Sequence, residues 1–269
     1  MSTTRAGVGE RATEREVAEL VEAAQKWGVE AGEFTLRYYG HRVKFEDKLD
    51  GTPVTVADRG AEQLLRERIS ARFPDHAVLG EEYGESNPGA RVRWVLDPVD
   101  ATRAFTRGVP IFGVLIGIEV AGEPVVGVAN FPALREIVVA ARGLGCRWNG
   151  EPCRVSETDR IEDSLVLTTD VEHALASPHG PGYRRLQQRA QFARTWGDCY
   201  GHCLVATGRA EIMFDPEMAP WDAGPFPTIL TEAGGRFTSV RGETTIHGGS
   251  GVSTNGWLHD AVLKTLAER

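Results

Sequence analysis

The sequence predicts a layered α+β and α/β protein, with N-terminal helices on an antiparallel sheet and a smaller mixed α/β sheet after them. Three observations support this fold class. Apolar residues recur at three- and four-residue steps over residues 11–39, which is typical of amphipathic helices. Residues 92–155 form successive β-rich runs joined by tight turns. From residue 164 onward, strand-like and helix-like segments alternate.

The N-terminal elements follow in order. After the helix or helices of residues 11–39, an Asp-Gly pair and Pro53 mark a turn, and residues 54–56 predict a short extended piece. Asp58 stands at the expected N-cap of a second helix, which ends before Phe73 and Pro74. Residues 76–85 predict a short strand that runs into an acidic turn.

The central strands are expected at residues 92–97, 114–120, 123–131 and 136–142. Because sequential strands joined by tight turns pair antiparallel, they predict one antiparallel sheet with the two earlier helices packed on it. The later segments predict strands at 164–170, 210–215 and 236–240, and helices at 182–193, 199–207, 222–234 and 258–268. The change near residues 156–163 predicts two domains, 11–157 and 158–269.

Composition excludes several classes of protein. The net charge of the 269 residues is −8, and no basic run exceeds two residues, which disfavours a partner that is nucleic acid or an anionic membrane. The longest apolar stretch, residues 109–118, contains one proline and two glycines and is too short to span a bilayer. The first residues lack the apolar core of a signal peptide, and four cysteines make no disulfide framework. A cytoplasmic protein with reduced thiols is expected.

Asp97 and Asp100 flank Pro98 at the end of a predicted buried strand. Because Pro98 restricts its own backbone and that of Asp97, the two carboxylates and the Val99 carbonyl can converge. An Asp-Pro sequence is also ordinary turn chemistry, so this motif alone does not establish a metal site. Further acidic residues at other predicted element ends favour the metal site: Asp58, Glu81 and Asp222.

Several carboxylates in one cleft repel one another, and a bound hard cation removes that cost. Ligands that are all oxygen favour Mg²⁺ over zinc. Ala101 and Thr102 follow the second aspartate and open a helical turn, whose free N–H groups can bind a phosphate. Anion-binding amides beside a group of metal ligands predict metal-assisted hydrolysis of a phosphate ester.

Six segments occur in an order that resembles the inositol monophosphatase-like family over residues 17–266. They are GTPVTVAD (51–58), GEE (80–82), WVLDPVDAT (94–102), VATG (205–208), WDAG (221–224) and EAGG (232–235). The resemblance implies an αβαβα layered fold, an Mg²⁺-dependent phosphomonoesterase with two or three ions in each active site, and a homodimer.

The resemblance also implies roles for individual residues. The implied metal ligands are Glu81, Asp97, the main-chain carbonyl of Val99, Asp100 and Asp222. The implied catalytic group is Thr102 with Asp58, and Glu81 near them, which together activate the water that attacks phosphorus in line. Lys48 stands ten residues before Asp58, as a lysine of the family does near the active-site entrance; salt pairing with a neighbouring aspartate is an equal alternative.

Within the family, the segments at 103–118 and 195–222 resemble the histidinol-phosphatase branch. L-Histidinol phosphate, a small metabolite of histidine biosynthesis, carries an ammonium and an imidazole, and acidic side chains suit a cationic leaving group. Asp198 and Asp215 are therefore expected to bind substrate, with Cys199 beside them and Ala101 and Thr102 at the phosphate. Alternatively, Asp198 caps a helix. Tyr200 stacks on the imidazole or belongs to the core.

Two departures from the family pattern leave alternatives open. Ala101 stands where the family has glycine, and Pro225 and Pro227 stand at the start of a helix that is usually rich in alanine and leucine. Ala101 keeps its N–H, but its methyl is costly where the backbone needs a positive φ. The alternatives are an inositol-1-phosphate or broad small-metabolite phosphatase, and a non-catalytic relative that binds a phosphorylated metabolite.

Overall fold

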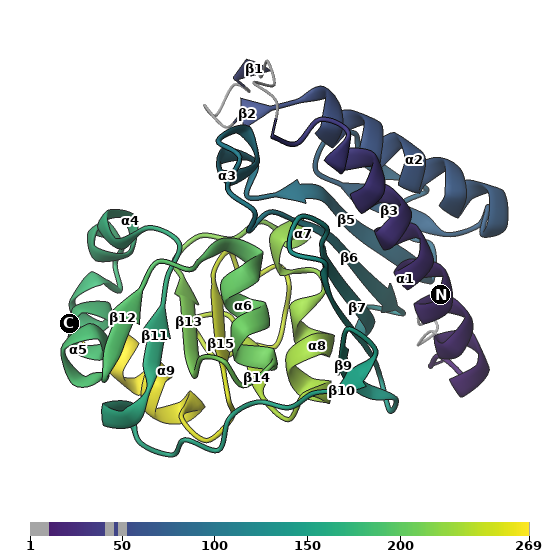
Figure 1. Ribbon diagram of the computed structural model, residues 1–269. Helices are drawn as coiled ribbons and strands as arrows, with labels where there is room; N and C mark the ends of the chain where they lie inside the picture. Colours follow the sequence, from purple (N-terminus) through teal and green to yellow (C-terminus); the bar gives the residue numbers. More distant parts are fainter. Residues whose placement is uncertain (1–10, 41–45, 48–52, 269) are drawn as a thin grey trace, which may run out of the picture.

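The computed structural model describes residues 11–40, 46–47 and 53–268. Figure 1 shows two helices, α1 (Glu14–Leu36) and α2 (Val56–Arg72), lying over one face of a large sheet. The eight strands of this sheet have the order β10-β9-β8-β7-β6-β5-β3-β4, and all neighbours pair antiparallel except β3 with β5. Their bounds are β3 (Ala77–Gly80), β4 (Gly84–Ser86), β5 (Val92–Asp100), β6 (Gly113–Val120), β7 (Glu123–Phe131), β8 (Glu136–Ala141), β9 (Gly145–Trp148) and β10 (Glu151–Pro152).

A second, five-stranded sheet lies in the C-terminal half, with the order β12-β11-β13-β15-β14. The pairs β12–β11 and β11–β13 are parallel, and the pairs β13–β15 and β15–β14 are antiparallel. The strands are β11 (Leu165–Leu167), β12 (Phe192–Arg194), β13 (Ile212–Asp215), β14 (Arg236–Thr238) and β15 (Gly251–Thr254). The helices of this half are α4 (Val171–Ala176), α5 (Gly180–Arg189), α6 (Asp198–Ala206), α7 (Pro220–Ala223), α8 (Phe226–Glu232) and α9 (His259–Ala267), with a 3₁₀ turn at Ile161–Asp163.

The layers follow from three apolar cores. One core joins α1 and α2 to the outer face of the large sheet, with Trp27 and Trp94 in contact at a ring-centroid distance of 5.5 Å. A second packs α6 and α8 between the two sheets, and a third packs α5 and α9 on the far face of the small sheet. The order of layers is therefore αβαβα, as expected. Because the middle core belongs to both halves, the division into two domains stays a prediction.

Close backbone contacts bring the C-terminal half onto the large sheet. A methyl group on Gly117 of β6 would lie 2.4 Å from the carbonyl oxygen of Gly224, and one on Gly127 of β7 would lie 2.3 Å from that of Pro225. Only glycine fits at both points. They allow the junction between α7 and α8 to rest directly on β6 and β7, and so bring α7 next to β5.

Several predicted elements need correction. Asp58 is not the N-cap of α2: Thr55 is, and Asp58 is the third helical residue, whose carboxylate accepts from the Thr55 N–H in a capping box. The helix expected at 182–193 ends at Arg189, and Phe192–Arg194 forms the edge strand β12.

Two more corrections concern short helices. The helix expected at 222–234 is two helices, α7 and α8, and α4 was not predicted. Pro220 and Pro227 occupy first-turn positions of α7 and α8, and Pro225 is the N-cap of α8. A missing N–H costs little at these places, so the prolines begin the helices.

The two-stranded ribbon of β1 (Glu46–Asp47) and β2 (Pro53–Val54) and the short helix α3 (Thr102–Thr106) complete the described chain. No helix in this described part is long and apolar enough to cross a bilayer.

Candidate active site

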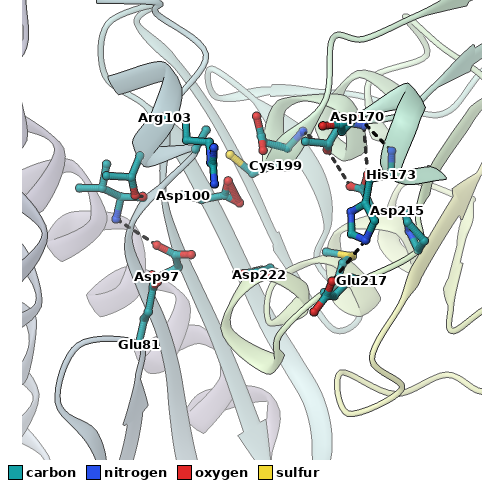
Figure 2. A pocket seen from close by; sticks show the side chains of 17 residues that line it. Glu81, Asp97, Asp100, Arg103, Asp170, His173, Cys199, Asp215, Glu217 and Asp222 are labelled. Atoms are coloured by element: carbon teal, nitrogen blue, oxygen red, sulfur yellow. Dashed lines mark hydrogen bonds and ion pairs between the residues drawn. The ribbon is translucent and has the colours of Figure 1, made fainter. Parts of the chain in front are cut away.

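A cavity of about 240 Å³ opens where the end of β5 and the start of α3 face the ends of β11 and β13 and the starts of α6 and α7 (Figure 2). Parallel strands such as β11 and β13 carry their loops to one edge of the sheet, where ligands commonly bind. Ten of the predicted residues line this cavity: Glu81, Asp97, Val99, Asp100, Ala101, Thr102, Asp198, Cys199, Asp215 and Asp222.

Three carboxylates in the cavity form the metal-site candidate. One oxygen from each of Asp97, Asp100 and Asp222 lies within 4.8 Å of the other two. Asp97 is 2% exposed and Asp100 9%, at the end of β5, and Asp222 comes from the first turn of α7. Glu81, which follows β3, lines the same cavity.

Electrostatics at this group favour a bound cation. Burial, followed by repulsion from Glu81, Asp100 and Asp222, raises the pKa of Asp97 well above its ordinary value. Burial also raises the pKa of Asp100, with repulsion from Asp198 and Asp222, while a hydrogen bond from the Cys199 main chain lowers it. Ionised together, these groups are stable only beside compensating positive charge. Their oxygen-only donor set fits Mg²⁺.

Ala101 and Thr102 make the turn from β5 into α3. Ala101 has φ 65° and ψ 45°, the left-handed conformation that glycine adopts more easily. The Thr102 hydroxyl lies 3.0 Å from the Val99 carbonyl oxygen and 3.3 Å from Asp58 Oδ1, so its single proton serves one acceptor at a time.

Asp58 lies behind Thr102, 1% exposed, and does not line the cavity itself. Its Oδ2 accepts from the Thr55 N–H at 2.9 Å and from the Thr55 hydroxyl at 2.5 Å. Burial raises the pKa of Asp58 to about 6, although the two Thr55 hydrogen bonds lower it. A carboxylate with this pKa can take a proton near neutral pH.

The opposite wall is a hydrogen-bonded chain at the ends of β11 and β13. The Thr169 main chain and hydroxyl donate to the two oxygens of Asp215 at 3.1 and 3.0 Å. The Asp198 N–H in turn donates to the Thr169 hydroxyl at 2.7 Å. Behind them lies buried His202. Its Nδ1 is hydrogen-bonded to the Ser253 hydroxyl at 2.7 Å, and its Nε2 lies 3.4 Å from Asp215 Oδ2. The chain fixes Asp198 at the start of α6, where its φ is 50°.

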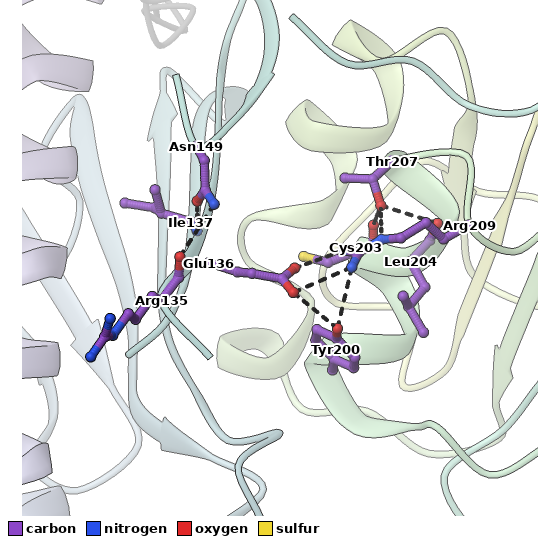
Figure 3. Close-up of polar contacts among 9 residues, drawn as sticks. All are labelled: Arg135, Glu136, Ile137, Asn149, Tyr200, Cys203, Leu204, Thr207 and Arg209. Carbon is purple, nitrogen blue, oxygen red and sulfur yellow. Dashed lines mark hydrogen bonds and ion pairs between the residues drawn. The ribbon is translucent and has the colours of Figure 1, made fainter. Parts of the chain in front are cut away.

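Some predicted residues lie elsewhere. Lys48 lies outside the described residues. Tyr200 does not line the cavity: its hydroxyl contacts Glu136 and Arg209 at 3.3 Å, in a polar cluster between β8 and α6 (Figure 3). It therefore ties α6 to the large sheet, which agrees with the alternative that Tyr200 belongs to the core and not with the alternative that it stacks on a substrate imidazole.

Sequence reasoning missed other residues of the cavity, including Thr169, Arg103, His173 and Glu217. His173 on α4 lies 3.4 Å from Glu217, both side chains are more than half exposed, and Figure 2 shows the pair on the side of the cavity away from Asp97. No motif in the sequence marks His173 or Glu217, and the helix α4 that carries His173 was not predicted. Arg103 could have been found from the sequence, because it directly follows the predicted site residue Thr102.

Comparison with known proteins gives a consistent result. The model of the inositol monophosphatase family matches residues 16–269. A histidinol-phosphatase of Chlorobaculum parvum is 47% identical over 227 residues, covering 84% of this chain and 88% of that protein. One of Mycobacterium tuberculosis is 38% identical over 239 residues, covering 86% and 91%. Among solved structures, the extragenic suppressor protein suhB of Bartonella henselae has a TM-score of 0.84 at 26% identity, covering 93% of this chain and 99% of that one.

Proposed function

This chain belongs to the inositol monophosphatase family, and we propose that it is an Mg²⁺-dependent phosphomonoesterase that hydrolyses L-histidinol phosphate to L-histidinol and phosphate. The proposal is carried by one observation: a carboxylate group suited to metal and an acidic wall suited to a cationic leaving group face each other across one cavity. Relatives named histidinol-phosphatase, 36–47% identical over most of the chain, support the choice of ester.

Metal binding is assigned to Glu81, Asp97, Asp100, Asp222 and the Val99 carbonyl, with two or three Mg²⁺ ions in each site. When bound, the ions offset the charge of the carboxylates and of the phosphate and lower the pKa of water. The residues of this chain hold the metal-binding carboxylates in position. Asp97 is held toward the cavity by the Val99 N–H, which donates to its Oδ1 at 3.0 Å.

Thr102 and Asp58 are proposed to orient the attacking water. When the Thr102 hydroxyl donates its hydrogen bond to Asp58, its lone pairs are free to accept a hydrogen bond from water in the cavity. Ionised Asp58 then takes up the proton that the water loses, through Thr102. The N–H groups at the start of α3 bind the phosphate, which approaches in line with the water.

The leaving group is proposed to lie against Asp198 and Asp215. Asp198 is fixed through Thr169, and its carboxylate pairs with a cationic group better than with a hydroxyl. Cys199 lies beside them, 2% exposed, and closes the floor of the cavity with its main chain bound to Asp100. Lys48 is proposed to lie near the entrance. The active form is proposed to be a cytoplasmic homodimer.

The test is phosphate release from L-histidinol phosphate and inositol 1-phosphate, with Mg²⁺ titrated against EDTA. We expect turnover that depends on Mg²⁺ and a clear preference for histidinol phosphate. A preference above tenfold for inositol 1-phosphate contradicts the choice of ester and favours the broader phosphatase. Phosphate binding without turnover on a panel of monoesters contradicts catalysis altogether.

A further inference from the structure

Arg103 is the only lysine or arginine among the described residues that line the cavity. Within the described part of the chain, its guanidinium makes no hydrogen bond or ion pair. Figure 2 shows that it points from α3 into the cavity. The other charged groups of the lining are carboxylates, apart from His173: Glu81, Asp97, Asp100, Asp170, Asp198, Asp215, Glu217 and Asp222.

Asp198 stands on the opposite wall, at the start of α6. Burial raises its pKa to about 7, as does repulsion from Asp215 and Asp222, while the positive charge of Arg103 lowers it. The two side chains therefore interact across the cavity without contact. Because α3 extends from the large sheet and α6 lies between the sheets, the fold presents one positive and one negative group from two separate supports.

We propose that Arg103 and Asp198 together select phosphate monoesters with an ammonium group on the carbon next to the ester carbon. Arg103 donates to the phosphate, beside the N–H groups at the start of α3, and Asp198 accepts from the ammonium. The inference rests on the proposed function, since L-histidinol phosphate has this arrangement. It extends that function to a class, the 2-aminoalkyl phosphates, in which the imidazole is not required.

Charge complementarity explains why Arg103 and Asp198 would favour amino esters over polyol phosphates. A polyol phosphate supplies the anion for Arg103 but leaves the Asp198 carboxylate buried without a cationic partner, which is costly. An amine without phosphate leaves Arg103 unused. An ester with both charges, separated by two carbons, satisfies both groups at once.

The experiment uses the Mg²⁺-loaded full chain and three esters: L-histidinol phosphate, 2-aminoethyl phosphate and 2-hydroxyethyl phosphate. D198N is expected to lose at least ten times more kcat/KM on the two amino esters than on the hydroxy ester. R103Q is expected to lose about tenfold to a hundredfold on all three, with R103K intermediate because lysine keeps the charge without the planar fork. The inhibition constant of inorganic phosphate should rise about tenfold in R103Q alone.

Folding is preserved in these variants, because asparagine tolerates the positive φ of Asp198 and Arg103 is exposed. R107Q, an exposed arginine at the end of α3 outside the cavity, is the matched control and should keep wild-type constants. Equal losses of D198N on amino and hydroxy esters, or an unchanged phosphate constant in R103Q, overturn the inference. A wild type that prefers inositol 1-phosphate contradicts the proposed function instead, and the two simple esters still decide the role of the pair.

Discussion

The Thr102 hydroxyl lies 3.3 Å from Asp58 Oδ1, although the two residues are 44 positions apart in the chain. This contact joins the first turns of α2 and α3. The same Asp58 carboxylate caps α2 through its other oxygen, so one side chain serves both the helix and the site.

The first prediction concerns this contact. T102V should lower kcat about a hundredfold or more, because valine has a similar shape but cannot relay a proton to Asp58. T102S should keep most of the activity, since serine keeps the hydroxyl. T106V, in the same helix, is the control, and steady-state kinetics on histidinol phosphate measures all three. Near-normal turnover by T102V would remove Thr102 from the mechanism.

The second prediction separates charge from catalysis at Asp97. D97N should lower activity about a thousandfold or more, because it weakens the hold on the divalent ion. The metal-free D97N protein should nevertheless melt at a higher temperature than wild type, since a buried charge that repels its neighbours has been removed. Thermal melts with and without Mg²⁺ measure this. E123Q, exposed at the start of β7, should change neither property. Wild-type turnover by D97N would contradict the assigned metal site.

The third prediction concerns the strained Ala101. A left-handed alanine costs about 1–2 kcal/mol, and the greater freedom of glycine in the unfolded chain returns about 0.4–1 kcal/mol of that. The net gain is at most about 1.6 kcal/mol, so A101G should raise the melting temperature by up to about 6 °C, at about 2–4 °C per kcal/mol. A121G is a matched control: Ala121 has φ 53° in the β6–β7 turn, outside the cavity. Both variants should be stabilised, and only A101G should change kcat or KM. A destabilised A101G would show that the methyl group makes favourable contacts.

The fourth prediction concerns pH. Because the pKa of Asp198 is raised in the folded state to about 7, the folded chain binds a proton that the unfolded chain has lost above about pH 4. Ionisation of Asp198 therefore destabilises metal-free wild type progressively as pH rises from about 4 to about 7. The melting temperature of D198N minus that of wild type should rise over this interval by roughly 10 °C, because about three pKa units correspond to about 4 kcal/mol, at about 2–4 °C per kcal/mol. A flat difference would mean that Asp198 titrates normally.

The fifth prediction concerns the cluster in Figure 3. The Arg209 guanidinium lies 2.8 Å from Glu136 and 4.2 Å from the centre of the Trp148 ring, and the ion pair is mostly buried. R209M should cost about 2–3 kcal/mol, because it leaves Glu136 without its charged partner. R236M, which removes an exposed pair with Asp260, should cost less than about 1 kcal/mol. Chemical denaturation measures both, and equal costs would contradict a stabilising role for the cluster.

The family and the layered fold were predicted from the sequence and are confirmed. Strands β5 to β8 could be found because their runs are long and almost wholly apolar. The short strands β4, β9 and β10 were not predicted. Short elements were harder: α4 has six residues and β12 three, too few for a periodic pattern. Asp58 was misplaced as an N-cap because Thr55 and Asp58 share one capping box, and either residue suits the first position.

Sequence motifs predicted the site residues that lie within them, but not the contacts in the fold that bring distant motifs together. Asp97 and Asp100 lie on one strand, so their proximity follows from local geometry. Asp222 joins them through the close approach of Gly117 to Gly224, which no local pattern reveals. The sequence left Tyr200 open between stacking on a substrate imidazole and the core, because no local pattern shows which way a helical side chain points; in the structure Tyr200 faces β8.

The repulsion among the buried carboxylates has a practical consequence for handling the protein. If the proposed ions occupy the site, a chelator removes the groups that activate water and also leaves the repulsion among the buried carboxylates uncompensated. Storage in citrate or EDTA is therefore expected to lower the melting temperature of the protein as well as its activity. Added Mg²⁺ is therefore expected to raise the melting temperature of the folded chain.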